Sequence, residues 1–193
     1  MMKNLLKQVM ITGAVATLTA TSMSAQMALP ENLTLSSASK VWFDGTSNVK
    51  SFSCSAGKLD VDVASDADAT PAKLVKSASL ALQVAQLDCK NGKMNEHMRE
   101  ALKADKNPRI MWKLSSYTID GNSVVMAGTL NIAGKENPIE LRGRGAYANG
   151  TLTLKGSKVL NMTDFGVKPP SLMFGTMKVA NPVTVWYELV LNQ

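Results

Sequence analysis

The sequence predicts an all-β protein in which roughly eight antiparallel strands and one short α-helix form a barrel or sandwich. Apolar residues occupy every second position in most segments of the chain, as they do in strands that bury one face. Asp120-Gly121 and Asn149-Gly150 are dipeptides typical of hairpin turns. One segment alone has the spacing of a helix. We favour the barrel because closure removes the strand edges at which sheets aggregate.

The clearest hairpin lies within residues 128–141. Its two apolar runs alternate with small or polar residues, so each run presents one apolar face. We expect residues 134–138, a Gly-Lys-Glu-Asn-Pro sequence, to separate the two strands of this hairpin, because glycine and proline interrupt strands. The apolar positions are Leu130, Ile132, Ile139 and Leu141.

The other strands follow the same pattern between short turns. Residues 37–39 and 64–70 are small and polar and are expected to be turns or loops. We expect Gly45 to end the first strand. The apolar residues of the fourth strand, Leu74, Ala78, Leu80, Leu82 and Val84, all fall on even positions. The predicted strands are residues 40–44, 49–56, 58–64, 73–86, 109–118, 123–133, 139–147, 151–160 and 181–191.

Residues 92–104 change to a helical period. Met94, Met98, Ala101 and Leu102 recur at i, i+4, i+7 and i+8, which places them on one face of a helix. Asn91 is the expected N-cap, and a proline follows shortly after the predicted end. One amphipathic helix therefore interrupts the β pattern.

The first 25 residues have the order of a secretory signal peptide. A basic start with Lys3 and Lys7 precedes an uncharged apolar stretch over residues 9–20 and then small residues. The apolar stretch is shorter than the ~20 residues that span a bilayer. We expect cleavage near residue 25, export to the periplasm or the medium, and one domain over residues 26–193.

Charge excludes some partners. Without Lys3 and Lys7 the chain keeps 19 of its 21 basic residues against 15 acidic ones, and these are scattered. No basic cluster interleaves with aromatic residues, so we expect no nucleic-acid partner. No later apolar run is long enough for a stable membrane span. The sequence leaves a homodimer open.

Cys54 and Cys89 are the two cysteines of the chain. In an oxidising compartment an even pair is most simply a disulfide. A metal site needs more ligands than two thiols, and a nucleophilic cysteine needs a base, for which the chain offers only His97. We therefore predict a disulfide.

Several stretches resemble, in order along the chain, the YceI-like family of exported, lipocalin-like barrels. They are residues 45–52 (Gly-Thr-Ser-Asn-Val-Lys-Ser-Phe), 95–98 (Asn-Glu-His-Met), 108–112 (Pro-Arg-Ile-Met-Trp), the hairpin over residues 128–139, and 163–167 (Thr-Asp-Phe-Gly-Val). The resemblance implies an eight-stranded antiparallel lipocalin-like barrel with a lengthwise apolar cavity. It also implies a long-chain amphiphilic ligand, such as a polyisoprenoid, an isoprenoid quinone or a fatty amide. Relatives often carry arginine two residues before the aspartate of Asp-Phe-Gly, where this chain has Met162.

We expect such a ligand to contact inward-facing apolar side chains and the apolar loop over residues 172–177. That loop follows two prolines and is either a lid at the barrel mouth or a plug that packs the barrel end. The candidate ligand-binding residues are Leu80, Leu82, Trp112, Leu114, Leu130, Ile132, Phe165, Met173, Phe174, Met177 and Tyr187.

Two further motifs have structural as well as functional interpretations. Met94, His97 and Met98 fall at i, i+3 and i+4, and their ligand types suit Cu(I). Methionines, of which the chain has 12, also fill irregular cores. Asp164-Phe165-Gly166 matches a kinase motif without any other kinase element, so we interpret it as a turn whose phenylalanine packs into the barrel.

No catalytic group of residues is evident, since the chain has one histidine and no Gly-x-Ser-x-Gly motif. We therefore expect a non-enzymatic binding protein with no cofactor and no metal. The alternative is an exported barrel with a filled interior that acts through protein or copper contacts.

Overall fold

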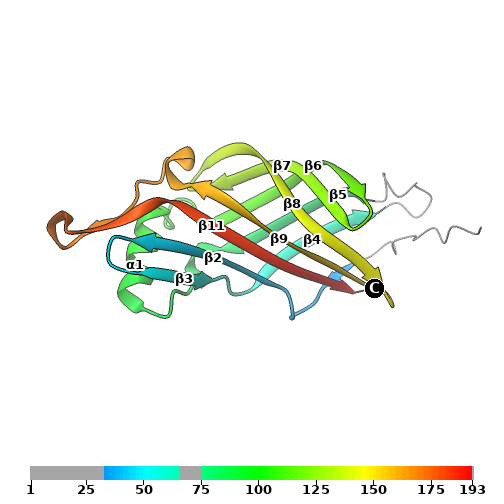
Figure 1. Ribbon diagram of the computed structural model, residues 1–193, viewed down its shortest axis with the longest axis horizontal. Coiled ribbons are helices and arrows are strands. Elements are labelled where there is room, and N and C mark those ends of the chain that lie inside the picture. The colour runs from blue at the N-terminus through cyan, green and yellow to red at the C-terminus, as the bar shows by residue number, and fades with distance from the viewer. Residues whose placement is uncertain (1–32, 66–74, 193) are drawn as a thin grey trace, which may run out of the picture.

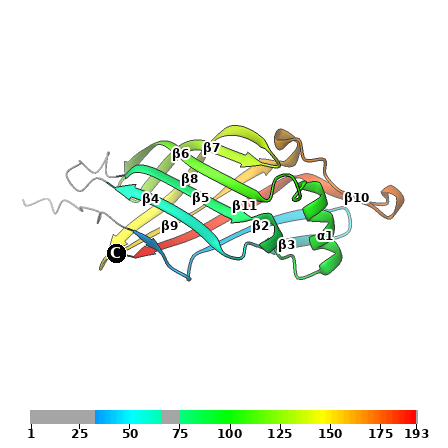
Figure 2. The same cartoon turned by 180° about the vertical axis from the view of Figure 1, so that it is seen from behind.

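The computed structural model describes residues 33–65 and 75–192. Its strands form a single curled antiparallel sheet, and one α-helix lies at one end of it (Figures 1 and 2). The predicted all-β antiparallel fold class is confirmed. The elements are β1 (Thr34–Leu35), β2 (Lys40–Ser47), β3 (Ser51–Ser55), β4 (Leu59–Ser65), β5 (Val75–Gln83), α1 (Gly92–Ala101), β6 (Arg109–Asp120), β7 (Ser123–Ile132), β8 (Lys135–Ala148), β9 (Thr151–Asn161), β10 (Ser171–Leu172) and β11 (Met177–Asn192).

The strand order shows how the sheet curls. It runs β3-β2-β11-β9-β8-β7-β6-β5-β4, so the last long strand returns to pair with β2 near the start of the chain. This order holds nine strands where we expected eight, and the short β1 and β10 pair with β11 as additions. Within the described ranges no ladder joins β3 to β4. An isolated bridge between Ser55 and Asp88 ties β3 to the segment before α1 instead.

The hairpin of β7 and β8 is longer than predicted. Its turn is Ala133-Gly134, both with positive φ (53° and 82°), and β8 begins at once with Lys135. The predicted break over residues 134–138 is therefore wrong, since Pro138 lies within β8 opposite Thr129. Because β9 pairs with β8 only from Arg142 onward, Pro138 lies where β8 has one free edge and tolerates a residue without an N–H.

Two predicted strand ends are also wrong. β2 continues through Gly45, because the missing Cβ leaves room for the ring of Phe52: a Cβ there would lie 2.3 Å from the ring's Cζ. The predicted strand over residues 73–86 ends at Gln83, after which Val84 and its two successors form a short 3-10 helix. Val84 is almost completely buried. Its burial in the core explains why the alternation of apolar residues continues in the sequence beyond the end of the strand.

The helix α1 forms where the sequence predicts it, although it ends at Ala101 rather than residue 104. The side chain of Asn91 accepts a hydrogen bond from the Met94 amide at 3.0 Å, which confirms the predicted N-cap. Both views place α1 at the end of the sheet where β2 turns into β3 and where β10 lies (Figures 1 and 2). Within the described ranges, the helices are too short or too polar to cross a bilayer.

Two clusters of buried apolar residues form the core. Leu102 and Ile110 border both of them, so the end of α1 and the start of β6 join them into one core. The buried members of the first cluster are Leu59, Leu82, Val84 and Leu87, and those of the second are Leu130, Leu160, Phe165 and Val167.

Candidate functional site

The curled sheet encloses a cavity of about 550 Å³. Inward-facing side chains of the long strands and of α1 form its wall, and this wall is almost entirely apolar. Strand β9 illustrates the alternation: Leu154 and Leu160 line the cavity, whereas Val159 between them is 58% exposed on the outer face. A volume of this size is within the range of pockets that hold small organic ligands.

Most of the predicted ligand-binding residues lie on the cavity wall. The sheet brings together nine of them from four strands and the turn after β9, together with Ile110 and Leu141, which belong to the same alternating runs. The nine are Leu80, Leu82, Trp112, Leu114, Leu130, Ile132, Phe165, Met177 and Tyr187. The side chain of Met173 falls outside the described part of the structure.

Phe174 is an exception. Its side chain is fully exposed at the tip of the loop between β10 and β11, and it does not belong to the cavity wall. The backbone of Phe174 is in the left-handed region (φ 55°, ψ 33°) within the short turn Met173–Gly175. Phe174 therefore does not line the cavity. The apolar residues of the loop do not predict the sharp turn at its tip, where Phe174 is exposed.

Polar residues of the cavity wall, which the sequence analysis missed, gather near α1. The wall includes Lys50 in the β2–β3 turn, Asn91, Lys93 and His97 at or in α1, and Lys158 on β9, but no aspartate or glutamate. Lys50, Asn91 and Lys93 are exposed to solvent as well, so the cavity opens beside them. Ile119, which is 48% exposed, marks a second approach to solvent at the opposite end.

Lys158 has a signal that sequence reasoning could have used. It lies on β9 in step with Leu154 and Leu160, so strict alternation turns its side chain inward. Among the described residues no acidic side chain pairs with it. A charged group on an apolar wall is costly to desolvate unless it finds a partner, so Lys158 is suited to hold a polar ligand group.

Trp112 contributes a large apolar surface to the wall and crosses the strand beside it. Its indole Nε1 is buried without a hydrogen-bond partner and faces β7 at Gly128, where a Cβ would lie 2.7 Å from it. Glycine at this position therefore allows the indole to lie close to the backbone.

Tyr187 is held by a similar arrangement on the neighbouring strands. Its hydroxyl donates a hydrogen bond to the carbonyl oxygen of Arg142 at 3.0 Å. A Cβ at Gly156 would lie 2.3 Å from that hydroxyl oxygen, and one at Gly143 would lie 2.9 Å from it. Burial raises the pKa of Tyr187 to about 12, so the phenol remains a neutral donor at physiological pH.

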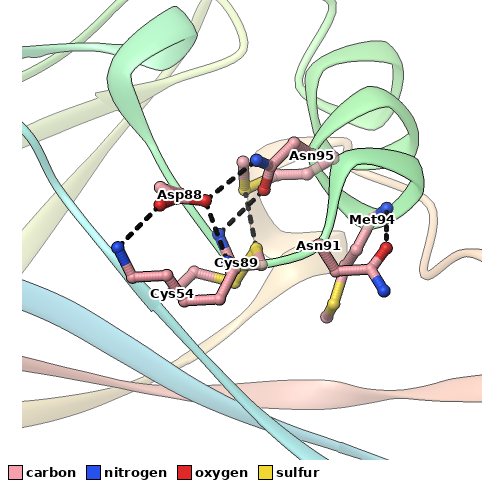
Figure 3. The surroundings of a disulfide bond; sticks show 8 residues. Cys54, Asp88, Cys89, Asn91, Met94 and Asn95 are labelled. Carbon is pink, nitrogen blue, oxygen red and sulfur yellow. Dashed lines mark hydrogen bonds and ion pairs between the residues drawn. A yellow bond between two sulfur atoms is a disulfide. The ribbon is translucent and has the colours of Figure 1, made fainter.

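A disulfide and a hydrogen-bond network attach α1 to the sheet (Figure 3). Cys54 on β3 and Cys89 before α1 are bonded, with Cα atoms 3.9 Å apart, which confirms the predicted disulfide. The Asn95 side chain accepts from the Cys89 amide at 2.8 Å and donates to the Asp88 carboxylate at 3.0 Å. The Asn95 amide and the Lys90 ammonium and backbone amide together hold the pKa of Asp88 well below its usual range.

This attachment positions the helix residues that line the cavity. Met94, His97 and Met98 all contribute to the wall, and the sulfur of Met98 lies 3.8 Å from Cys89 Sγ. His97 Nδ1 lies 3.5 Å from a carboxylate oxygen of Glu100. Across residues 33–65 and 75–192, no group of three His, Cys, Asp or Glu side chains is arranged to hold a metal ion. Copper binding by the two thioethers and the imidazole stays the alternative to the predicted absence of a metal.

The Asp-Phe-Gly segment forms the turn that follows β9. Phe165 is 4% exposed and is a buried member of the second apolar cluster, as the structural interpretation predicts. Gly166 ends the 3-10 helix Met162–Phe165 with φ 67°. Asn137 donates a hydrogen bond to the Asp164 carbonyl oxygen at 2.8 Å, which ties this turn to β8.

Comparison with known proteins gives one family and several similar structures. The model of the YceI-like domain matches residues 15–191. BcnA from Burkholderia cenocepacia shares 25% identity at a TM-score of 0.67, over 79% of this chain and 95% of that chain. The YCEI protein of Campylobacter jejuni shares 17% identity at a TM-score of 0.61, over 72% and 84%.

A third similar structure is a polyisoprenoid binding domain from Saccharophagus degradans implicated in plant cell wall breakdown. It shares 12% identity at a TM-score of 0.61, over 83% of this chain and 96% of that chain, which is a likeness of fold. No curated protein matches the chain.

Proposed function

The chain belongs to the YceI-like family, and we propose that it is a non-enzymatic protein that binds a long-chain amphiphilic lipid in its barrel. The observation that carries the proposal is the cavity of about 550 Å³, apolar along its length and polar near α1. Burial of apolar surface contributes about 25 cal/mol for each Å², so a long chain can bind without many polar contacts. The wall offers no paired acid and base or activated nucleophile among the described residues, which favours binding over turnover.

The ligand class that we propose is an isoprenoid lipid, such as a polyisoprenoid or isoprenoid quinone, or a fatty amide. The fold is shared with a polyisoprenoid binding domain from Saccharophagus degradans, which supports the isoprenoid as first candidate. The nine predicted ligand-binding residues on the cavity wall, Leu80 and Trp112 among them, would contact the chain of this lipid.

We orient the ligand with its polar head toward α1. The cationic or hydrogen-bonding side chains of Lys50, Lys93, His97 and Lys158 line that part of the cavity. The family resemblance implies an arginine at the position of Met162, which begins the 3-10 helix after β9. Lys158 lies on β9 four residues earlier, and both residues line the cavity. Lys158 therefore supplies from a neighbouring position a cation that this chain lacks at Met162.

Export to the periplasm or the medium is part of the proposal. The disulfide between Cys54 and Cys89 is consistent with an oxidising compartment. The signal-like residues 1–25 precede the described part of the structure.

The first test is to purify the exported chain from a lipid-containing host and measure its intact mass under native conditions, followed by solvent extraction. We expect a bound apolar compound and, after its removal, a rise in melting midpoint when an isoprenoid quinone or fatty amide is added. At a free ligand concentration of 100 times Kd, binding stabilises the folded state by about 2.7 kcal/mol. A barrel that carries no lipid and does not respond to any of these compounds has a filled interior, and the proposal is then wrong.

The second test examines the head-group end. Replacing Lys158 with methionine removes a charged donor, and hydrogen bonds to charged groups contribute about 1.5–3 kcal/mol. We expect Lys158→Met to weaken the binding of a quinone or fatty amide about tenfold or more. The binding of a hydrocarbon of equal length should stay unchanged. Lys113→Met, on an exposed residue outside the cavity wall, is the matched control. An equal loss of affinity for the hydrocarbon and for the quinone would contradict the proposed orientation.

A further inference from the structure

Two exposed apolar side chains project beside the polar end of the cavity. Phe174, at the tip of the β10–β11 hairpin, is fully exposed, and Val49, in the β2–β3 turn, is 67% exposed. Both turns lie at the α1 end of the barrel in the two views, and the β10–β11 hairpin extends beyond the body of the sheet (Figures 1 and 2). Large apolar side chains at the tip of a projecting hairpin are costly in water unless they meet a partner.

Hydrogen bonds to Asn48 hold the two turns together as one unit. The Asn48 side chain donates to the Thr176 carbonyl oxygen at 2.7 Å and accepts from the Lys178 amide at 2.8 Å. The Asn48 amide donates to the Lys178 carbonyl oxygen at 3.1 Å. The two apolar tips, Val49 and Phe174, therefore project from one braced surface.

The same surface is cationic. Residues 47–51 and 168–178 contain Lys50, Lys168 and Lys178 and no acidic residue. All three lysines are exposed, and within the described ranges none forms an ion pair. Acidic side chains on the adjacent α1 are already engaged, since Glu96 pairs with Lys93 and Glu100 lies beside His97. The surface therefore combines exposed apolar tips with unpaired positive charge.

The surface is also continuous with the cavity. Ser47 and Lys50 flank Val49 and line the cavity, and Pro170 and Met177 do the same at the base of the hairpin that carries Phe174. A partner on this surface would cover the cavity opening near α1. An aromatic tip with flanking lysines matches the bilayer interface, where rings enter the head-group region and lysines meet anionic lipid.

We propose that the β2–β3 turn and the β10–β11 hairpin form a docking surface for anionic lipid bilayers, through which the cavity exchanges its ligand with the membrane. Docking itself follows from Val49, Phe174 and the three lysines. The exchange step alone rests on the proposed lipid-binding function.

The experiment measures sedimentation of the full exported chain with vesicles of phosphatidylcholine alone or with an equal part of phosphatidylglycerol. We expect binding to the anionic vesicles that weakens as salt is raised. Each lysine near an anionic surface contributes about 1 kcal/mol, so replacing Lys50, Lys168 and Lys178 with glutamine should weaken binding on the order of 100-fold. The control replaces Lys40, Lys113 and Lys155, exposed lysines on strands away from this surface, and should leave binding largely unchanged.

Phe174→Ser tests the apolar tip and should weaken vesicle binding without lowering the melting midpoint, because the ring is fully exposed. Val159→Ser, on the outer face of β9, is its control. Equal binding to neutral and anionic vesicles, or equal binding by Phe174→Ser and Val159→Ser, would overturn the proposal. Self-association of the chain that Phe174→Ser abolishes would instead assign the tip to a dimer contact and overturn it as well.

A second measurement separates this proposal from the lipid-binding function. Ligand-free protein is loaded from vesicles that contain an isoprenoid quinone, and separately from the quinone dispersed in solution. We expect Phe174→Ser to slow loading from vesicles several-fold and to leave loading from solution unchanged. Vesicle binding without loading from either source would retain the docking surface and contradict the lipid-binding function.

Discussion

At the scale of single residues, glycines determine where large side chains of the barrel can lie. Tyr187 occupies space that a Cβ at Gly156 would fill, and Trp112 does the same at Gly128. In both cases an aromatic side chain crosses a neighbouring strand at a position without a side chain. Trp112 and Tyr187 therefore pack closely against the neighbouring strands and also line the cavity.

Tyr187 makes stability depend on pH in the alkaline range. Burial raises its pKa from 10.0 to about 12, so the neutral form is favoured in the folded state. This contribution is complete below pH 10 and is lost as the pH rises through about 12, on the order of 1–3 kcal/mol in total. We expect the free energy of unfolding of the wild type to fall over this range by more than that of Tyr187→Phe.

The measurement is urea unfolding of both proteins at intervals between pH 8 and the alkaline limit of folding. Lysines and the other tyrosines titrate in both proteins, so only the difference between the two curves reports on Tyr187. At neutral pH, Tyr187→Phe should cost about 1 kcal/mol for the lost hydrogen bond to Arg142. Parallel curves throughout would show that the buried phenol does not titrate as described.

At the scale of elements, α1 depends on its attachments more than on its own length. It has ten residues, which is short for a helix that must be stable alone. Its start is fixed by the Asn91 cap and by the network of Asp88, Cys89 and Asn95. The disulfide connects this network to β3, so α1 remains over the end of the cavity.

Removal of the disulfide should therefore destabilise the whole fold. Cys54 and Cys89 are 35 residues apart in sequence, and in the chain-entropy model closure of such a loop contributes roughly 3–4 kcal/mol. We expect the double variant Cys54→Ala, Cys89→Ala to lose a free energy of unfolding of that size in urea. Reductant should lower the stability of the wild type to a similar degree and leave the variant unchanged. Two free thiols per chain in denaturant without reductant would contradict the bond itself.

At the scale of the whole molecule, the question is whether the interior accepts added volume. In a packed core, extra methylene groups usually cost about 1–3 kcal/mol, whereas an open cavity accepts an apolar ring without loss. Ala78 on β5 lines the cavity. We expect Ala78→Phe to keep or raise the melting midpoint and to weaken lipid binding, because the ring occupies the space of the ligand.

Ala146→Phe is the matched control, since Ala146 is exposed on β8 outside the cavity wall. It should leave lipid binding unchanged. The two variants are compared by thermal unfolding with and without an isoprenoid quinone. Marked destabilisation by Ala78→Phe, with lipid binding unchanged, would show that the interior is filled and that the ligand binds elsewhere.

Comparison of particular elements shows how far sequence patterns reach. Leu130, Ile132 and Leu141 were predicted to share one interior from alternation alone, and they line one cavity. Alternation is local, because successive side chains of a strand point to opposite faces wherever the strand lies. The break predicted around Pro138 was wrong because only the register of β9 shows that this part of β8 has a free edge.

The alternating strands, the Asn91 cap and the cysteine pair follow from the amino-acid sequence, because each depends on neighbouring residues or on a count. The cavity in the interior, the position of Lys158 on its wall and the exposure of Phe174 outside it are evident only in the folded chain. These features depend on the curl of the sheet and on contacts between segments far apart in the chain, such as that of Asn48 with Thr176. The volume left between side chains is a property of how all the strands pack together, and no single segment of sequence records it.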